Sequence, residues 1–139
     1  MKTLVIAMIV LLILISGIYI YSGYIKNIEQ EFAKIIDEIS DSIIKNHWDE
    51  ANKKNEKLNA LWDKCEKKLA MFNDHGDLDE IELEIADLNK SIFYTDAEHA
   101  QKAVEKITIL FKRLVKNESF SLENILKSAH DRLSCHIML

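Results

Sequence analysis

The side chains that most often ligate metals or act as nucleophiles are sparse in this chain, which has five histidines and two cysteines. Only His130, Cys135 and His136 lie close together in sequence. A zinc site needs about four nitrogen or sulfur ligands in a tetrahedron, and this group offers three that are adjacent rather than spread. The remaining histidines share no ligand spacing within one helix; they are His47, His75 and His99. The sequence therefore predicts no catalytic residue, no metal site and no cofactor.

The two cysteines have different settings. Cys65 falls at the spacing of an apolar helix face, where a small core residue is the ordinary interpretation. Cys135 lies near the end of the chain. If the domain lies outside the cell, a bridge between Cys65 and Cys135 is one alternative and pairing of Cys135 between two chains is another. Spacing alone does not choose between them.

An acidic stretch runs from Asp74 to Asp87. A calcium loop needs oxygen ligands at alternating positions about a glycine turn, but here Gly76 comes too early and Leu78 interrupts the acids. Negative charge is also favourable at the N-terminus of a helix. We therefore interpret this stretch as a helix start and its solvated face, and expect no calcium site.

A second charged stretch carries six lysines between residues 53 and 68: Lys53, Lys54, Lys57, Lys64, Lys67 and Lys68. Acids are interleaved with them, which favours i,i+4 pairing on an exposed helix face. Contact with anionic lipid headgroups or wall polymer is the functional alternative. On the same expected helix, Trp62 has core spacing and Trp48 is expected to close a helical corner, so neither is predicted to bind a ligand.

All of these side chains follow an N-terminal segment, Thr3 to Ile25, that carries no charged side chain. At ~1.5 Å per helical residue it reaches ~34 Å, enough to cross a ~30 Å hydrocarbon core. Three tyrosines near its end resemble an interfacial belt; they are Tyr19, Tyr21 and Tyr24. The apolar run is longer than a usual signal core and no small-x-small pair closes it. We therefore expect residues 1–25 to be an uncleaved single-pass membrane anchor.

The charges that flank this segment do not by themselves give its orientation in the membrane. Lys2 favours a cytoplasmic N-terminus, but Lys26 and Lys34 lie beyond the other end of the segment, so the positive charges do not decide. A signal-like segment at the start most simply places a long C-terminal domain outside the cell. The domain is thus predicted to be extracytoplasmic, at the cell membrane.

The remainder of the chain is predicted to be helical. There is no proline and there are only three glycines, so the usual punctuation of β-structure is missing. Apolar residues instead recur at steps of three and four. The expected stripes are Ile25, Ile28, Phe32, Ile35, Ile36, Ile39, Ile43 and Ile44; Trp48, Ala51, Leu58, Leu61, Trp62, Cys65, Leu69 and Phe72; Leu78, Ile81, Ile85, Leu88 and Ile92; and Ala100, Ala103, Val104, Ile107, Leu110, Phe111 and Leu114. Acids and bases are mixed without a basic stripe, which excludes nucleic acid as a partner.

Helix boundaries are predicted from polar residues between the stripes. Asn46 is expected to be the N-cap of the second helix, and Gly76 to take a left-handed position after its end. Asp77 or Asp79 is expected to cap the third helix. Thr95 and Glu98 have the spacing of a capping box at the start of the fourth.

The first two soluble helices match the next two at an offset that places Phe32 on Ile81 and Ala51 on Ala100 without a gap. The expected fold class is all-α: an N-terminal transmembrane helix, then two αα-hairpins as a four-helix antiparallel bundle or a short repeat-like stack. The expected helical domain is 26–126, with hairpins 26–73 and 74–116 and a closing helix 121–127. A tail, 128–139, follows.

Several segments together resemble an uncharacterised family of small single-pass membrane proteins from clostridia and related Gram-positive bacteria, catalogued as a domain of unknown function. They are His47 to Ala51, Leu61-Trp62 with Lys64, Phe72 to His75, Ile81 to Leu88, and Ser121 to Leu126. The resemblance implies the anchor and a bacterial membrane setting, and it implies no activity. Members are encoded beside multipass membrane proteins, which implies a membrane partner.

The sequence thus favours a non-enzymatic interaction or scaffold module. Its expected partners are membrane lipid through the N-terminal helix, and another membrane protein or a second copy of itself. The alternative is an extracytoplasmic domain that senses a small molecule or an ion. That alternative predicts a cavity lined by polar groups within the bundle.

Overall fold

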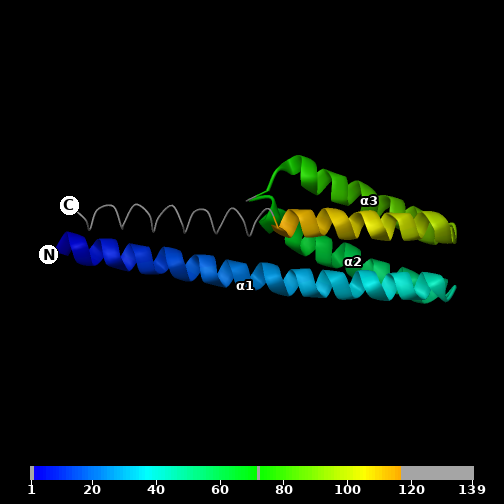
Figure 1. Cartoon of the computed structure of the whole chain (residues 1–139), viewed down its shortest axis with the longest axis horizontal. Helices are drawn as coiled ribbons and strands as arrows, with labels where there is room; N and C mark the ends of the chain where they lie inside the picture. The colour runs from blue at the N-terminus through cyan, green and yellow to red at the C-terminus, as the bar shows by residue number, and fades with distance from the viewer. Residues whose placement is uncertain (1, 72, 117–139) are drawn as a thin grey trace.

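The computed structural model describes residues 2–71 and 73–116, which form four helices (Figure 1). Helix α1 spans Lys2–Ile44, α2 spans Trp48–Leu69 and α3 spans His75–Phe93. The fourth helix occupies residues 97–116. No strand occurs within these two ranges, so the predicted all-α fold class with an apolar N-terminal helix is confirmed. The closing helix 121–127 and the tail 128–139 lie outside the described residues.

The four helices close into a ring. Helix α2 packs against both α1 and α3. The fourth helix bonds to α3 through Lys106 and Glu84, and it meets α1 through Phe111, whose ring stacks on Phe32 with centroids 3.8 Å apart and planes 6° apart. Because the fourth helix returns to α1, the architecture is a four-helix antiparallel bundle rather than an open stack.

The core is built from the predicted stripes. All four helices contribute buried aliphatic residues, among which Ile39, Leu58, Leu88 and Ile107 are fully buried. The expectation for Ile44 was wrong: its side chain is 68% exposed, because it lies one position past Ile43 and so turns away from the face that Ile39 and Ile43 bury. Two predicted core residues, Ile35 and Trp48, are only partly buried, and Phe72 lies outside the described residues.

Both outer corners of the bundle close by the same backbone hydrogen bonds. At the first, His47 N donates to Ser42 O and Asn46 N to Ile43 O; at the second, Asp96 N donates to Ser91 O and Thr95 N to Ile92 O. Asn46 and Thr95 have left-handed φ values of 57° and 53°. These are Schellman motifs, which satisfy the last carbonyls of a helix. The two corners match at the offset found in the sequence.

The predicted caps at these corners were wrong. Asn46 ends α1 in the left-handed conformation, so it is not the N-cap of α2; His47 is, without a side-chain hydrogen bond. Thr95 likewise closes the preceding turn, and Asp96 caps the fourth helix by accepting from His99 N at 3.1 Å. Glu98 pairs with Lys102 instead of completing a capping box.

The connection between α2 and α3 also differs from expectation. Gly76 has no positive φ, because it lies in the first turn of α3 rather than after the end of α2. Asp74 is the N-cap of α3 and accepts from Gly76 N at 3.2 Å, in place of the expected Asp77 or Asp79. The side chain of Asp77 instead bonds Arg113 on the fourth helix.

Candidate functional site

The end of the bundle farthest from the start of α1 is here called the distal end; it carries the corners at residues 45–47 and 94–96 (Figure 1). Two aromatic residues are exposed there. Phe93 is 79% and Tyr94 67% exposed, and their rings pack edge to face with centroids 5.2 Å apart. Large apolar side chains exposed together are typical of contact surfaces.

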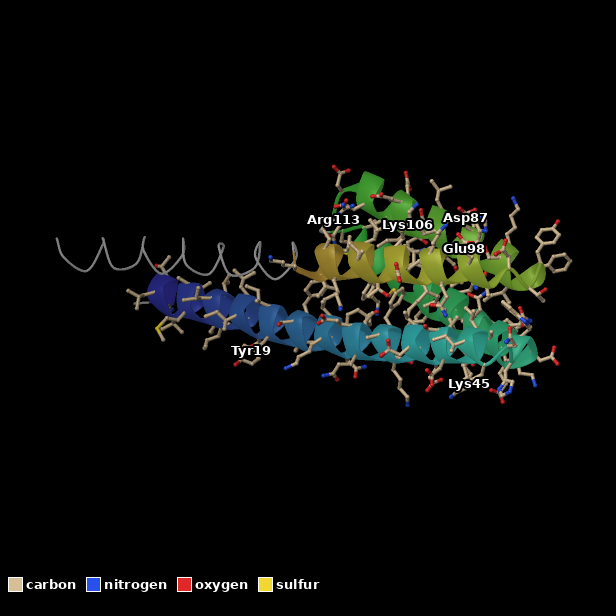
Figure 2. The ribbon with its side chains drawn as sticks, turned by 45° about the vertical axis from the view of Figure 1, so that its right-hand side comes forward. Tyr19, Lys45, Asp87, Glu98, Lys106 and Arg113 are labelled. Carbon is tan, nitrogen blue, oxygen red and sulfur yellow. The ribbon has the colours of Figure 1, made fainter. Side chains whose placement is uncertain are left out.

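Beside this aromatic pair, a groove of about 380 Å³ follows the seam between α3 and the fourth helix. Its lining is polar and mixed in charge: Glu84, Asp87, Lys90, Ser91, Tyr94, Asp96, His99, Lys102, Ala103 and Lys106. Figure 2 shows Asp87, Glu98 and Lys106 along this seam, with Arg113 at its other end. Nothing in the apolar stripes predicted this groove, because its residues occupy the outward faces of two helices that are adjacent only in the folded chain.

Two pairs of polar side chains in the groove are bonded to each other. Lys106 Nζ lies 2.7 Å from Glu84 Oε1, which raises the pKa of Lys106. Asp96 accepts from the backbone N–H of His99, which lowers the pKa of Asp96, and its Oδ2 lies 2.8 Å from His99 Nδ1. The groove therefore carries both signs of charge, a surface suited to a zwitterionic or mixed-charge group.

Serine, histidine and aspartate occur together in this groove, and their contacts are structural. Ser91 Oγ donates to Asp87 O at 2.8 Å, four residues back along α3, so its proton is directed at the backbone. Asp96 is a helix cap. A nucleophile needs its hydroxyl bonded to a general base, and Ser91 instead makes the same backbone contact that Ser42 makes to Glu38 O.

The remaining predicted candidates are separated in the fold. His47 lies at the first corner, 3.8 Å from Glu50, and His75 begins α3. Within the described ranges, no three His, Cys, Asp or Glu side chains gather as a metal site would require. Cys65 is a buried free thiol, and burial raises its pKa to about 12, so it is a poor nucleophile. His130, Cys135 and His136 lie outside the described residues.

The lysines of α2 do not pair as the sequence suggested. Lys54 reaches across to Glu38 of α1 at 3.0 Å, which lowers the pKa of Glu38. Lys68 Nζ lies over the ring of Tyr24, 4.3 Å from its centroid. Within 2–71 and 73–116 no ion pair joins a lysine of α2 to an acid of the same helix. The i,i+4 pairs that do occur are Lys45 with Asp41 and Lys102 with Glu98, on other helices.

Sequence reasoning missed a polar cluster between α2 and α3. Asn55 is buried, and its side-chain amide donates to Asn89 Oδ1. Asn59 exchanges two further hydrogen bonds with Asn89, at 3.0 and 3.1 Å. Ala51, Asn55 and Leu58 follow a spacing of four and three, so a polar residue on an apolar stripe was the signal available.

Helix α1 carries the one stretch of the described residues that is long and apolar enough to cross a membrane. The mean hydropathy of its best window is 2.8, and none of that window is buried against the rest of the protein. Figure 2 shows Tyr19 on this lone part of the helix, away from the bundle. The three tyrosines of this region differ in their surroundings. Tyr19 is 81% exposed, whereas Tyr21 and Tyr24 pack against the core.

Comparison with known proteins identifies a family without an assigned activity. No curated protein and no solved structure matches the chain. A family model matches residues 19–125, from the tyrosine segment of α1 to a point beyond the described part of the fourth helix. The resemblance to an uncharacterised family is thereby confirmed. The chain belongs to DUF4363, a family defined by a domain of unknown function.

Proposed function

We propose that this protein is a non-catalytic interaction module, held at the cell membrane of a Gram-positive bacterium by the apolar part of α1. The bundle would present its distal end to another membrane protein. Nucleic acid is not among its partners. The observation that carries this proposal is that α1 runs from the apolar window into the bundle as one helix, Lys2–Ile44.

A continuous helix fixes the height of the distal end. From Ile25, the first buried residue of α1, to Ile44 there are 20 residues, which at ~1.5 Å each span ~30 Å. Phe93 and Tyr94 are exposed at that height. A partner that stands upright in the same membrane meets this end without a flexible linker, so less conformational entropy is lost on binding.

Photo-crosslinking in intact membranes tests the distal contact. A benzophenone amino acid at Phe93 is expected to give an adduct with a membrane protein, whereas the same group at Ile109 is expected to give none. Ile109 is a matched control because it is 65% exposed and lies on the fourth helix away from the distal corners. An adduct of twice the chain mass would identify a second copy as the partner. Equal adducts from both positions, or none from Phe93, would contradict the proposed distal contact.

We further propose that the bundle lies outside the cell. The test is labelling of intact cells by a membrane-impermeant thiol reagent, with one cysteine at Leu83 and both native cysteines replaced. Leu83 is 68% exposed on α3; Asn89 is less suitable because its side chain bonds Asn55 and Asn59. Labelling before lysis is the expected result, and labelling only after lysis would place the bundle in the cytoplasm.

The alternative function, binding of a small molecule, is favoured by one feature, the polar groove of about 380 Å³. Its paired charges suit a zwitterionic ligand such as a free amino acid. A thermal-shift screen of amino acids tests this, with Lys90→Gln as the variant because Lys90 lines the groove. A ligand that raises the unfolding midpoint of the wild type, but not that of the variant, would favour small-molecule binding over the interaction module.

A further inference from the structure

The free part of α1 is short. None of residues 2–20 is buried, and Tyr21 is the first residue to pack against the core. The uncharged free stretch, from Thr3 to Ile20, spans ~27 Å at ~1.5 Å per residue. A hydrocarbon core is ~30 Å thick. If this stretch crosses the membrane, no helix remains to lift the bundle away from the lipid surface.

The corner between α2 and α3, described at residues 70–71 and 73–74, lies at the level where the bundle begins. Figure 1 shows it beside the middle of α1, at the end of the bundle opposite the other two corners. The ammonium of Lys68, two residues before this corner, lies 4.3 Å from the centre of the Tyr24 ring. Tyr24 stands ~6 Å beyond Ile20 along the helix. That height falls within the headgroup layer, which adds roughly 5–8 Å to each side of the hydrocarbon core.

The side chains that face outward near this corner suit anionic headgroups. Lys64, Lys67, Lys68 and Met71 recur at steps of three and four, so they share one face at the end of α2. All four are exposed, and Met71 is 73% exposed. Among the described residues, none of these lysines has a carboxylate partner within ion-pair distance. Long lysine stems can run along the apolar surface while the ammonium reaches the phosphates.

Three acids at the same end are bonded within the protein. Asp77 and Glu80, in the first turns of α3, both bond Arg113 at 3.0 and 2.8 Å. Asp74 accepts from Gly76 N as the N-cap. On the last turns of α2, Asp63 and Glu66 accompany the three lysines, which leaves this end of α2 with a net positive charge.

We propose that the base of the bundle is a second membrane-contact site: Met71 enters the headgroup layer, and Lys64, Lys67 and Lys68 bind the phosphates of anionic lipids. The proposal rests on the proposed membrane anchoring by α1. It gives Lys64, Lys67 and Lys68 of α2 a partner, and it holds the bundle upright on the lipid surface. Each lysine near an anionic surface adds to the attraction, which weakens as salt is added.

Fluorescence quenching in vesicles tests the depth of the corner. The full chain, with Cys65→Ala and Cys135→Ser, is labelled with an environment-sensitive dye at single cysteines replacing Met71, Ile44 or Leu12, and placed in phosphatidylcholine vesicles with 30% phosphatidylglycerol (a composition chosen for its charge). Ile44 is the matched control, 68% exposed but at the distal end; Leu12 reports on the anchor. Headgroup spin-labelled lipid is expected to quench the dye at 71 at least twofold more than at 44.

The outcomes separate the two proposals. Equal quenching at 71 and 44, with the dye at 12 still quenched by lipid spin-labelled in its chains, would overturn the contact site and leave the anchor intact. Absence of quenching at 12 would overturn the anchoring, and the contact site with it.

A charge variant tests the role of the lysines. Lys64→Gln/Lys67→Gln/Lys68→Gln is compared with a control triple at the distal end, Lys45→Gln/Lys53→Gln/Lys90→Gln. In the wild type, quenching at 71 is expected to rise at least twofold when phosphatidylglycerol is added. The basal triple should lose that rise and the distal triple should keep it. If the basal lysines serve only the dipole of α2, their loss would lower the thermal midpoint without changing the quenching, and this result would overturn lipid binding.

Discussion

At the scale of single residues, the most consequential side chain is Asn55. It lies on the apolar stripe of α2, 3% exposed, and its amide donates to Asn89 across the interface with α3. Its own Oδ1 has no hydrogen-bond partner among the described residues. A buried polar group in this state depends on its remaining bond, since an unsatisfied buried amide costs about 1–3 kcal/mol. Asn55 thereby fixes how the first hairpin meets the second.

Removal of the acceptor tests this dependence. Asn89→Ala is expected to lower the free energy of unfolding by about 1–3 kcal/mol, because the Asn55 amide would then be buried without a partner. Adding Asn55→Val, which copies the equivalent Val104 of the fourth helix, should recover most of the loss. Urea denaturation followed by circular dichroism measures both. Asn52→Ala is the control, since the exposed Glu56 is the one side chain that Asn52 bonds among the described residues. No recovery in the double variant would contradict this interpretation.

Asp96 gives a pH-dependent prediction. Its pKa is lowered chiefly by the backbone N–H of His99, so its contribution to stability is present above the unfolded pKa of ~3.9 and is lost as the pH falls through the lower folded value. Asp96→Asn keeps a good N-cap but removes the titration. Between pH 6 and pH 2.5, the thermal midpoint of the wild type should therefore fall further than that of the variant. Glu38 titrates in both proteins and cancels, whereas the variant also removes the charge of Asp96, which raises the pKa of Glu98 in the wild type. If the thermal midpoints of the two proteins fell equally over this pH range, the cap would make no charge-dependent contribution to stability.

At the scale of elements, the two outer corners form a matched pair with unequal residues. Both require a left-handed residue, which is Asn46 at one and Thr95 at the other. Asparagine tolerates this conformation, whereas a β-branched residue is strained there. The corners therefore share a backbone but differ in strain, with the second corner the less favourable.

Exchange of these two residues measures the difference. Thr95→Asn is expected to raise the free energy of unfolding by about 1 kcal/mol, and Asn46→Thr to lower it by a similar amount, because a left-handed conformation costs an ordinary L-residue roughly 1–2 kcal/mol. Both side chains are exposed, so packing changes little. Chemical denaturation of the two single variants gives the values. A decrease for Thr95→Asn would contradict the strain assigned to this corner.

The buried helix faces could be predicted from the sequence, whereas the caps at these corners could not. The helix faces were predictable because burial repeats every three to four residues, and Ile81, Leu88 and Ile107 are fully buried as expected. The caps were not, because asparagine suits both an N-cap and a left-handed C-terminal position, and only the backbone angle decides. The groove, the Asn55 cluster and the Phe32–Phe111 stack depend on which helices become neighbours. No spacing along one helix contains that information.

At the scale of the whole molecule, the apolar segment and the core share one helix. The sequence placed a boundary after residue 25, at the last uncharged position. In the fold, Ile25 is a core residue, 6% exposed, and Tyr24 packs against that core beneath Lys68. The family match likewise begins at residue 19. The bundle is therefore complete only with the final turns of the apolar segment, and any tilt of that segment is passed to the bundle.

Two fragments distinguish these boundaries. Residues 19–139 retain the packing of Tyr21, Tyr24 and Ile25, whereas residues 26–139 lose it. Burial of one isoleucine contributes about 1.5–3 kcal/mol, so the shorter fragment should be less stable by about 2–3 kcal/mol in urea denaturation, with both fragments helical by circular dichroism. Tyr19→Ala in the longer fragment is the control, because Tyr19 is 81% exposed and should contribute little. Equal stabilities would mean that the core begins after residue 25, so that the apolar segment could bend without disturbing the bundle.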